Sequence, residues 1–148
     1  MKFYLDTSIF GGFFDKEFRY ATQALFDFIE NKRITIIYSD ILESELESAP
    51  EEIRLLATDS FIQAEYIDTT EEMLELAALY IKEGALTEKS LNDTQHIANA
   101  TISGVSAIIS WNFKHMANFM KIRQYNSIDL REGYRMINIH TPREIIGI

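Results

Sequence analysis

Short apolar runs alternate along the chain with longer segments in which apolar residues recur every three to four positions. The short runs predict buried strands and cover residues 3–5, 34–38, 61–67, 105–109 and 135–139. The longer segments predict amphipathic helices and cover residues 20–31, 39–48, 50–58, 70–83, 89–103, 112–120 and a last helix from 141. Strands that alternate with helices are typical of an α/β domain with a largely parallel sheet.

Glycine and proline mark where these segments should begin and end. The pair at 11–12 is expected to interrupt the chain after the first strand, and Gly84 and Gly104 should each end a helix. Pro50 and Pro142 stand where a helix can open, because the first helical turn does not need the missing N–H.

Length and composition limit what the protein can be. A chain of 148 residues with 47% hydrophobic content predicts one globular domain, residues 1–148. No apolar run has the length of a membrane span, and the opening Met-Lys-Phe-Tyr-Leu-Asp reaches an acid too soon for a secretory signal, so we expect a cytoplasmic protein. The absence of cysteine excludes disulfides, thiolate catalysis and zinc–sulfur sites.

The formal net charge of −9 argues against binding to nucleic acid through a broadly basic surface. One dense basic cluster stands out, formed by Lys114, His115, Lys121 and Arg123. Any contact with nucleic acid should therefore depend on bound metal and this local patch. The alternative is a solvated acidic surface suited to a basic protein partner.

Three carboxylates stand within apolar stretches that would normally exclude them. Asp6 directly follows the first apolar run, and Glu45 falls on the apolar arc of its helix, between Ile41 and Ala49. Asp93 lies in the first turn of the helix 89–103, on its apolar side. All three belong to the edge of the sheet where parallel strands end, which is where such folds bind ligands.

Each acid, taken alone, also fits a plainer role. Glu45 could be a boundary residue whose carboxylate reaches solvent, and Asp93 an ordinary first-turn acid stabilised by the helix dipole. His96 should lie at the edge of the same helix, toward its polar face. Three buried acids without a reserved basic residue nevertheless favour a hard divalent cation such as Mg²⁺ or Mn²⁺.

The order and spacing of these segments resemble the PIN-domain family, the fold of VapC-type toxin ribonucleases. The resemblance covers nearly the whole chain and rests on Tyr4-Leu-Asp-Thr-Ser-Ile9, Ser39 with Glu45-Leu46, Asp93-Thr-Gln-His-Ile-Ala-Asn-Ala100, Ile108-Ile-Ser-Trp-Asn-Phe-Lys-His-Met116 and Ile139-His-Thr-Pro-Arg-Glu-Ile-Ile146. It implies a three-layer α/β/α domain with a central, mostly parallel sheet.

The resemblance also implies a function. The protein would be a metal-dependent endoribonuclease, the toxin of a type II toxin–antitoxin pair, with an RNA substrate, a cognate antitoxin and, left open, a second copy of the chain as partners. It implies catalytic roles for Asp6, Glu45, Asp93 and Asn112, with Mg²⁺ or Mn²⁺ held by the three acids. Residues that would contact substrate or position these groups are Thr7, Ser8, His96, Ser110 and Lys114.

Asn112 departs from the usual pattern, because the fourth motif of the family usually carries Asp there, although a branch with Trp-Asn also occurs. An amide supplies an oxygen but no charge, so one alternative is a catalytically weakened PIN-like module that binds protein. Another is a phosphatase with Asp6 as nucleophile. Ser8 argues against it, since one such class carries a second Asp at that position.

Overall fold

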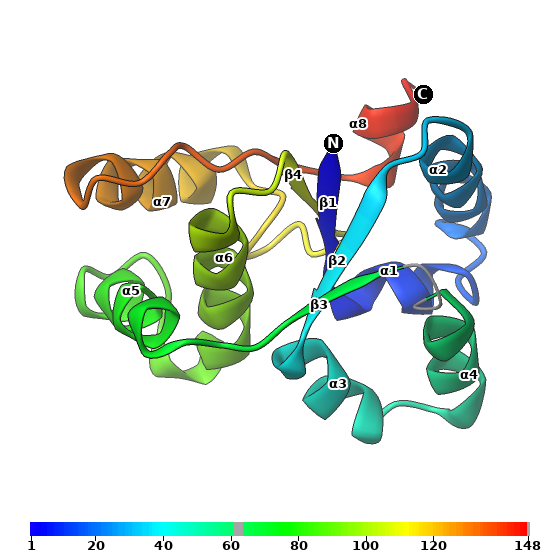
Figure 1. The fold of residues 1–148 in the computed structure, drawn as a ribbon, viewed down its shortest axis with the longest axis horizontal. Helices are drawn as coiled ribbons and strands as arrows, with labels where there is room; N and C mark the ends of the chain where they lie inside the picture. The colour runs from blue at the N-terminus through cyan, green and yellow to red at the C-terminus, as the bar shows by residue number, and fades with distance from the viewer. Residues whose placement is uncertain (61–63, 148) are drawn as a thin grey trace.

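The computed structural model describes residues 1–60 and 64–147 and shows a five-stranded parallel sheet between two layers of helices (Figure 1). This confirms the predicted three-layer α/β/α architecture. The strands are β1 (Lys2–Leu5), β2 (Thr35–Ser39), β3 (Glu65–Ile67), β4 (Ala107–Ile109) and β5 (Ile139–His140). The predicted strand 61–67 begins in residues 61–63, which lie outside the described part of the chain.

The helices confirm most of the predicted segments. They are α1 (Thr7–Gly12), α2 (Arg19–Asn31), α3 (Asp40–Glu47), α4 (Glu51–Ser60), α5 (Glu71–Lys82), the short η2 (Glu88–Ser90), α6 (Leu91–Ser103), α7 (Phe119–Arg131) and α8 (Pro142–Ile146). Within the described residues, none of these helices is long and apolar enough to cross a membrane.

The strand order β3-β2-β1-β4-β5 puts β1 at the centre and reverses direction beside it. From β1 the chain winds outward through β2 to β3, and then crosses to β4 on the other side of β1. Leu5 is paired with Ile109, so the ends of β1 and β4 are level with each other. This reversal is the point at which open parallel sheets bind ligands.

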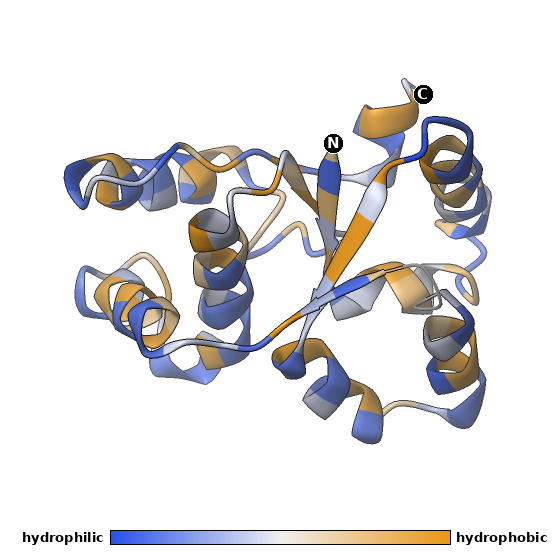
Figure 2. Cartoon of the chain, in the orientation of Figure 1, coloured by the Kyte–Doolittle hydropathy of each residue, from blue (hydrophilic) through white to orange (hydrophobic). Residues whose placement is uncertain are grey.

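Alternation along the strands divides the core into two parts. Phe3 and Leu5 pack on the layer of α1, α2, α3, α4 and α8, while Tyr4 packs on the layer of α5, α6 and α7. Ile36 and Ile37 divide in the same way in β2. Figure 2 shows the corresponding hydrophobic colouring of the strands and of the inner sides of the helices around them.

The prediction that Gly11 and Gly12 interrupt the chain is wrong, because both residues belong to α1. Gly12 is buried, and a Cβ atom there would lie 2.7 Å from the indole nitrogen of Trp111 and 2.5 Å from the hydroxyl of Thr22. The glycine is therefore needed for close packing of α1 and not for a turn.

The predicted helix 112–120 is also wrong, because residues 111–118 form a loop and α7 begins at Phe119. The side chain of Asn118 accepts a hydrogen bond from the N–H of Lys121 and so sets the start of the helix. Tyr125 and Arg131 belong to α7, in a stretch for which the sequence predicted no helix. Of the predicted strand 135–139, only Ile139 is in the sheet.

A buried carboxylate lies among α5, α6 and α7. Asp129 is fully buried and accepts hydrogen bonds from the hydroxyls of Tyr80, at 2.5 Å, and Thr101, at 3.4 Å. No ion pair with Asp129 occurs among residues 1–60 and 64–147. Burial raises the pKa of Asp129 from 3.8 to about 6, although its two hydrogen bonds oppose the change.

We expect Asp129→Asn to stabilise the protein near neutral pH. Because its pKa is higher in the folded than in the unfolded state, Asp129 favours folding below about pH 4, and this contribution is lost as pH rises through about 6. The variant should gain roughly 1 to 3 kcal/mol over wild type at pH 7.5 and little at pH 4. Urea denaturation at both pH values measures this, and a less stable variant at pH 7.5 would contradict it.

Candidate active site at the carboxyl edge of the sheet

Asp6 is at the centre of the candidate site, because it directly follows β1 at the reversal point of the sheet. Its side chain is only 4% exposed. One carboxylate oxygen accepts a hydrogen bond from Ser8 Oγ at 2.5 Å, and the other accepts one from Ser110 Oγ at 2.6 Å. The described residues contain no ion pair with Asp6, so its side-chain hydrogen-bond partners there are two neutral hydroxyls.

The environment of Asp6 makes its negative charge costly. Burial raises the pKa of Asp6 from 3.8 to about 6, the two serine hydrogen bonds and His96 oppose the change, and the charge of Asp93 adds to it. A bound cation at this position would remove this cost, because opposite charge favours the ionised carboxylate.

The same two serines hold the loop after β4 against the start of α1. Ser8 Oγ accepts the N–H of Trp111 at 2.9 Å, and Ser110 Oγ accepts the N–H of Asn112 at 2.9 Å. Trp111 is buried, donates its indole N–H to Thr22 and so belongs to the core. Asp6 and Asn112 are therefore held near each other by short covalent and hydrogen-bonded links.

Glu45 reaches the site from α3 and is held by α1 and α6. Its Oε1 accepts a hydrogen bond from Thr7 Oγ1 at 2.9 Å and contacts His96 Nε2. Burial raises the pKa of Glu45, but the hydrogen bond and charge of His96, with smaller contributions from Thr7 and Asn92, hold it below its ordinary value.

Behind Glu45 lies a buried chain of polar groups. The hydroxyl of Tyr4 lies 2.5 Å from His96 Nδ1 and 2.7 Å from Ser39 Oγ. Burial strongly raises the pKa of Tyr4, so the phenol keeps its proton. If Tyr4 donates to Nδ1, the neutral imidazole carries its own proton on Nε2 and donates it to Glu45, which satisfies every contact in the chain.

His96, expected at the edge of its helix toward the polar face, is only 1% exposed. Of the polar residues on that face, Asn92 is exposed, whereas His96 and Asn99 are buried and contact Tyr4 of β1 and Thr69, which follows β3. Asn99 donates to Thr69 Oγ1, next to the groups that surround His96. Polar residues on those strand ends replace water, which the periodicity of one helix cannot predict.

Asp93 is positioned by the loop that follows β4. Its Oδ2 lies 2.8 Å from His115 Nδ1 and 3.4 Å from the amide nitrogen of Asn112. The amide oxygen of Asn112 accepts the N–H groups of Lys114 and His115 at 3.1 and 2.9 Å. Asn112 thus uses its oxygen to shape the loop and offers its NH₂ group to Asp93.

Hydrogen bonds through Ser110 link Asp6 to Asn112, and the Asn112 amide links to Asp93, while Glu45 is bound to Thr7, the neighbour of Asp6 in the sequence. Within residues 1–60 and 64–147, however, no three acidic or histidine side chains stand close enough together to ligate one ion directly. The two histidines and the hydroxyls contact Glu45 Oε1, Asp93 Oδ2 and both oxygens of Asp6 in this arrangement. The assignment of the three acids to a metal therefore stays a prediction, one that fits the charge of the site but needs side-chain rearrangement or bridging water.

Sequence reasoning missed the two residues that most clearly position the acids. Tyr4 looked like an apolar strand residue, and its hydroxyl partner lies ninety-two positions away. His115 was placed on a helix that does not exist, whereas it faces Asp93 from a loop. Lys114 is exposed on the same loop and, within the described residues, no hydrogen bond or ion pair of its ammonium group is recorded.

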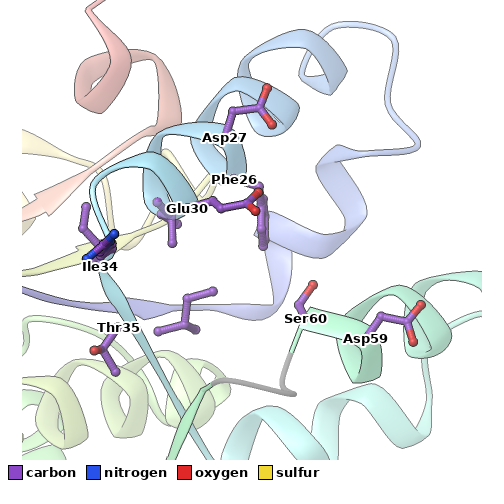
Figure 3. Close-up of a pocket in the computed structure, with 10 residues that line it drawn as sticks. Phe26, Asp27, Glu30, Ile34, Thr35, Asp59 and Ser60 are labelled. Atoms are coloured by element: carbon purple, nitrogen blue, oxygen red, sulfur yellow. The ribbon is translucent and has the colours of Figure 1, made fainter.

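A separate open cavity of about 760 Å³ lies among α2, β2 and α4. Figure 3 shows Asp27, Glu30 and Asp59 around it, together with Ile34 and Thr35 at the start of β2. Because β2 begins here, this cavity is at the opposite edge of the sheet from Asp6. It is not part of the candidate active site.

The sequence matches no protein-family model and no curated protein. The structure is similar to a chain of VapBC2 from Rickettsia felis bound to a DNA fragment from their promoter, with a TM-score of 0.65, 15% identity and coverage of 95% of this chain and 98% of that chain. It is also similar to VapC20 from Mycobacterium tuberculosis, a toxin that cleaves the sarcin–ricin loop, with a TM-score of 0.60, 13% identity and coverage of 92% and 98%. The chain therefore has the PIN-domain fold of the VapC toxins.

Proposed function

We propose that this protein is a metal-dependent endoribonuclease and acts as the toxin of a toxin–antitoxin pair. One observation carries the proposal: Asp6, a carboxylate without a cationic partner among the described residues, is buried at the reversal point of the sheet, with Glu45 and Asp93 nearby. The shared fold with two VapC toxin structures supports the same reading.

The chemistry would be hydrolysis of an RNA phosphodiester. Mg²⁺ or Mn²⁺, when bound by Asp6, Glu45 and Asp93, would acidify a water molecule and offset phosphate charge. His96 and Thr7 hold Glu45, and His115 and Asn112 hold Asp93, so a metal ion would reach both acids through bridging water or after these side chains move. Ser8 and Ser110 hold Asp6 with both oxygens in a set direction.

The proposed partners are an RNA substrate and a cognate antitoxin, and a second copy of the chain is a further candidate. The proposed location is the cytoplasm. VapBC2, to which the fold is similar, is a complex bound to DNA from its promoter. The alternative of a protein-binding module without activity is favoured by one observation, the amide of Asn112 in place of a fourth acid. The phosphatase alternative has no comparable support, since both oxygens of Asp6 accept hydrogen bonds and no second Asp follows at Ser8.

We expect Asp6→Asn to abolish RNA cleavage and growth arrest. The variant keeps the shape of the side chain but removes the charge needed to bind Mg²⁺ or Mn²⁺. Asp129→Asn is the matched control, because it removes the charge of another fully buried Asp away from the sheet edge. Cleavage of structured RNAs is measured with metal and with chelator. In metal, wild type and Asp129→Asn should cleave and Asp6→Asn should not. In chelator, none of the three proteins should cleave. Equal activity of wild type and Asp6→Asn would rule out the nuclease proposal.

We expect Asn112→Asp to lower the stability of the metal-free protein and to increase the stabilisation that Mn²⁺ produces. The new carboxylate would face Asp93, where the amide now donates at 3.4 Å, so like charges repel until a cation binds. Each tenfold gain in affinity adds about 1.4 kcal/mol at saturating Mn²⁺.

Thermal melts in chelator and in Mn²⁺ test this prediction, with Asn138→Asp as an exposed control at the opposite end of β5. The melting temperature of Asn112→Asp should be lower than that of wild type in chelator and should rise further on addition of Mn²⁺. If the Mn²⁺-induced rise is the same in all three proteins, Asn112 does not lie beside the ion.

A further inference from the structure

A small cavity of about 210 Å³ lies directly beside Asp93, between the turn after α5 and the loop before α7. It is lined by Gly84, Ala85, Leu86, Thr87, Ser90, Lys114, His115 and Lys121. From these residues we propose that the cavity binds one backbone phosphate of a single-stranded RNA, next to the phosphate that is cleaved. The inference rests on the proposed nuclease function and names how its substrate is held.

The charge of the cavity favours an anion. Lys114 and Lys121 come to it from the loop and from the first turn of α7, and neither lysine forms an ion pair within the described residues. The ammonium group of Lys121 donates to the carbonyl of Ala85 at 2.5 Å, which holds its charge at the wall. Glu88, on the adjacent turn, lines a different hollow between α5 and α6.

The cavity shares a wall with the candidate active site. The ring of His115 lies in this wall, with Nδ1 at 2.8 Å from Asp93 and 3.4 Å from the hydroxyl of Ser90. One imidazole therefore separates a carboxylate from two ammonium groups. A strand whose scissile phosphate lay at the acids would bring a neighbouring phosphate to the lysines.

The overall charge explains why such a site is needed. With a net charge of −9 the protein as a whole repels a polyanion, and one phosphate held by two lysines provides a local attraction that the acids cannot provide. Thr87 and Ser90 add hydroxyl groups that can donate to phosphate oxygens. Polar groups of this kind suit a phosphate better than an apolar ligand.

The test is binding of a short fluorescein-labelled single-stranded RNA of mixed sequence, in chelator, at several low salt concentrations. Lys114→Gln with Lys121→Gln should bind several-fold more weakly, and the slope of log K against log salt should be flatter by about 0.7, the value for one phosphate contact on a single strand. Lys2→Gln with Lys32→Gln is the control, because both lysines lie at the opposite edge of the sheet, and Lys32→Gln is also measured alone because Lys2 pairs with Glu65 at 3.1 Å.

Lys121→Gln removes a hydrogen bond to Ala85, so melting curves accompany the binding data. Lys114→Gln alone, at an exposed side chain, should still weaken binding, and Lys114→Arg should retain it. An unchanged slope in the double variant overturns the proposal, as does an equal loss in the control pair. Loss of binding to a glutamate-rich peptide with RNA binding unchanged overturns it in favour of a protein partner. Because no turnover is measured, inactivity of the enzyme would leave this result standing.

Discussion

The structure depends most on the burial of one charge, that of Asp6, at the end of the central strand. A carboxylate in this position is costly, and two serine hydroxyls, with a smaller contribution from His96, offset part of that cost. Those serines also accept the N–H groups of Trp111 and Asn112, so the same two hydroxyls bind the buried carboxylate and hold the loop after β4 beside it. The position of that loop therefore depends on the groups that surround Asp6.

The other two acids are each paired with a histidine and not with lysine or arginine. A guanidinium beside Glu45 would always be charged, whereas an imidazole can donate a hydrogen bond from Nε2 in either of its protonation states. His115 stands in the same relation to Asp93. Histidine thereby fixes the direction of a carboxylate and leaves its negative charge available to a cation, which suits a site that binds metal or substrate reversibly.

Periodicity predicted the helices α2 to α6, because each buries one apolar face, and short apolar runs predicted the strands β1, β2 and β4, because these are covered by helices on both sides. It failed at Gly12 and at α7, where the deciding contacts are with Trp111 and with the cap residue Asn118. Asp6 was identifiable as a candidate site residue from its place after a strand. The partnership of Tyr4 with His96 was not, because a contact between residues so distant in sequence leaves no local pattern.

Asn112 can be understood without a direct role in binding an ion. Its oxygen accepts two backbone N–H groups and its nitrogen approaches Asp93, and only an amide can both accept and donate in this way. Those two N–H groups belong to Lys114 and His115, so the same side chain sets the loop that separates the acids from the lysines. An acid at this position would keep the loop but repel Asp93. The amide therefore keeps the loop and Asp93 in a fixed arrangement, whereas an acid would add negative charge to the site and repel Asp93.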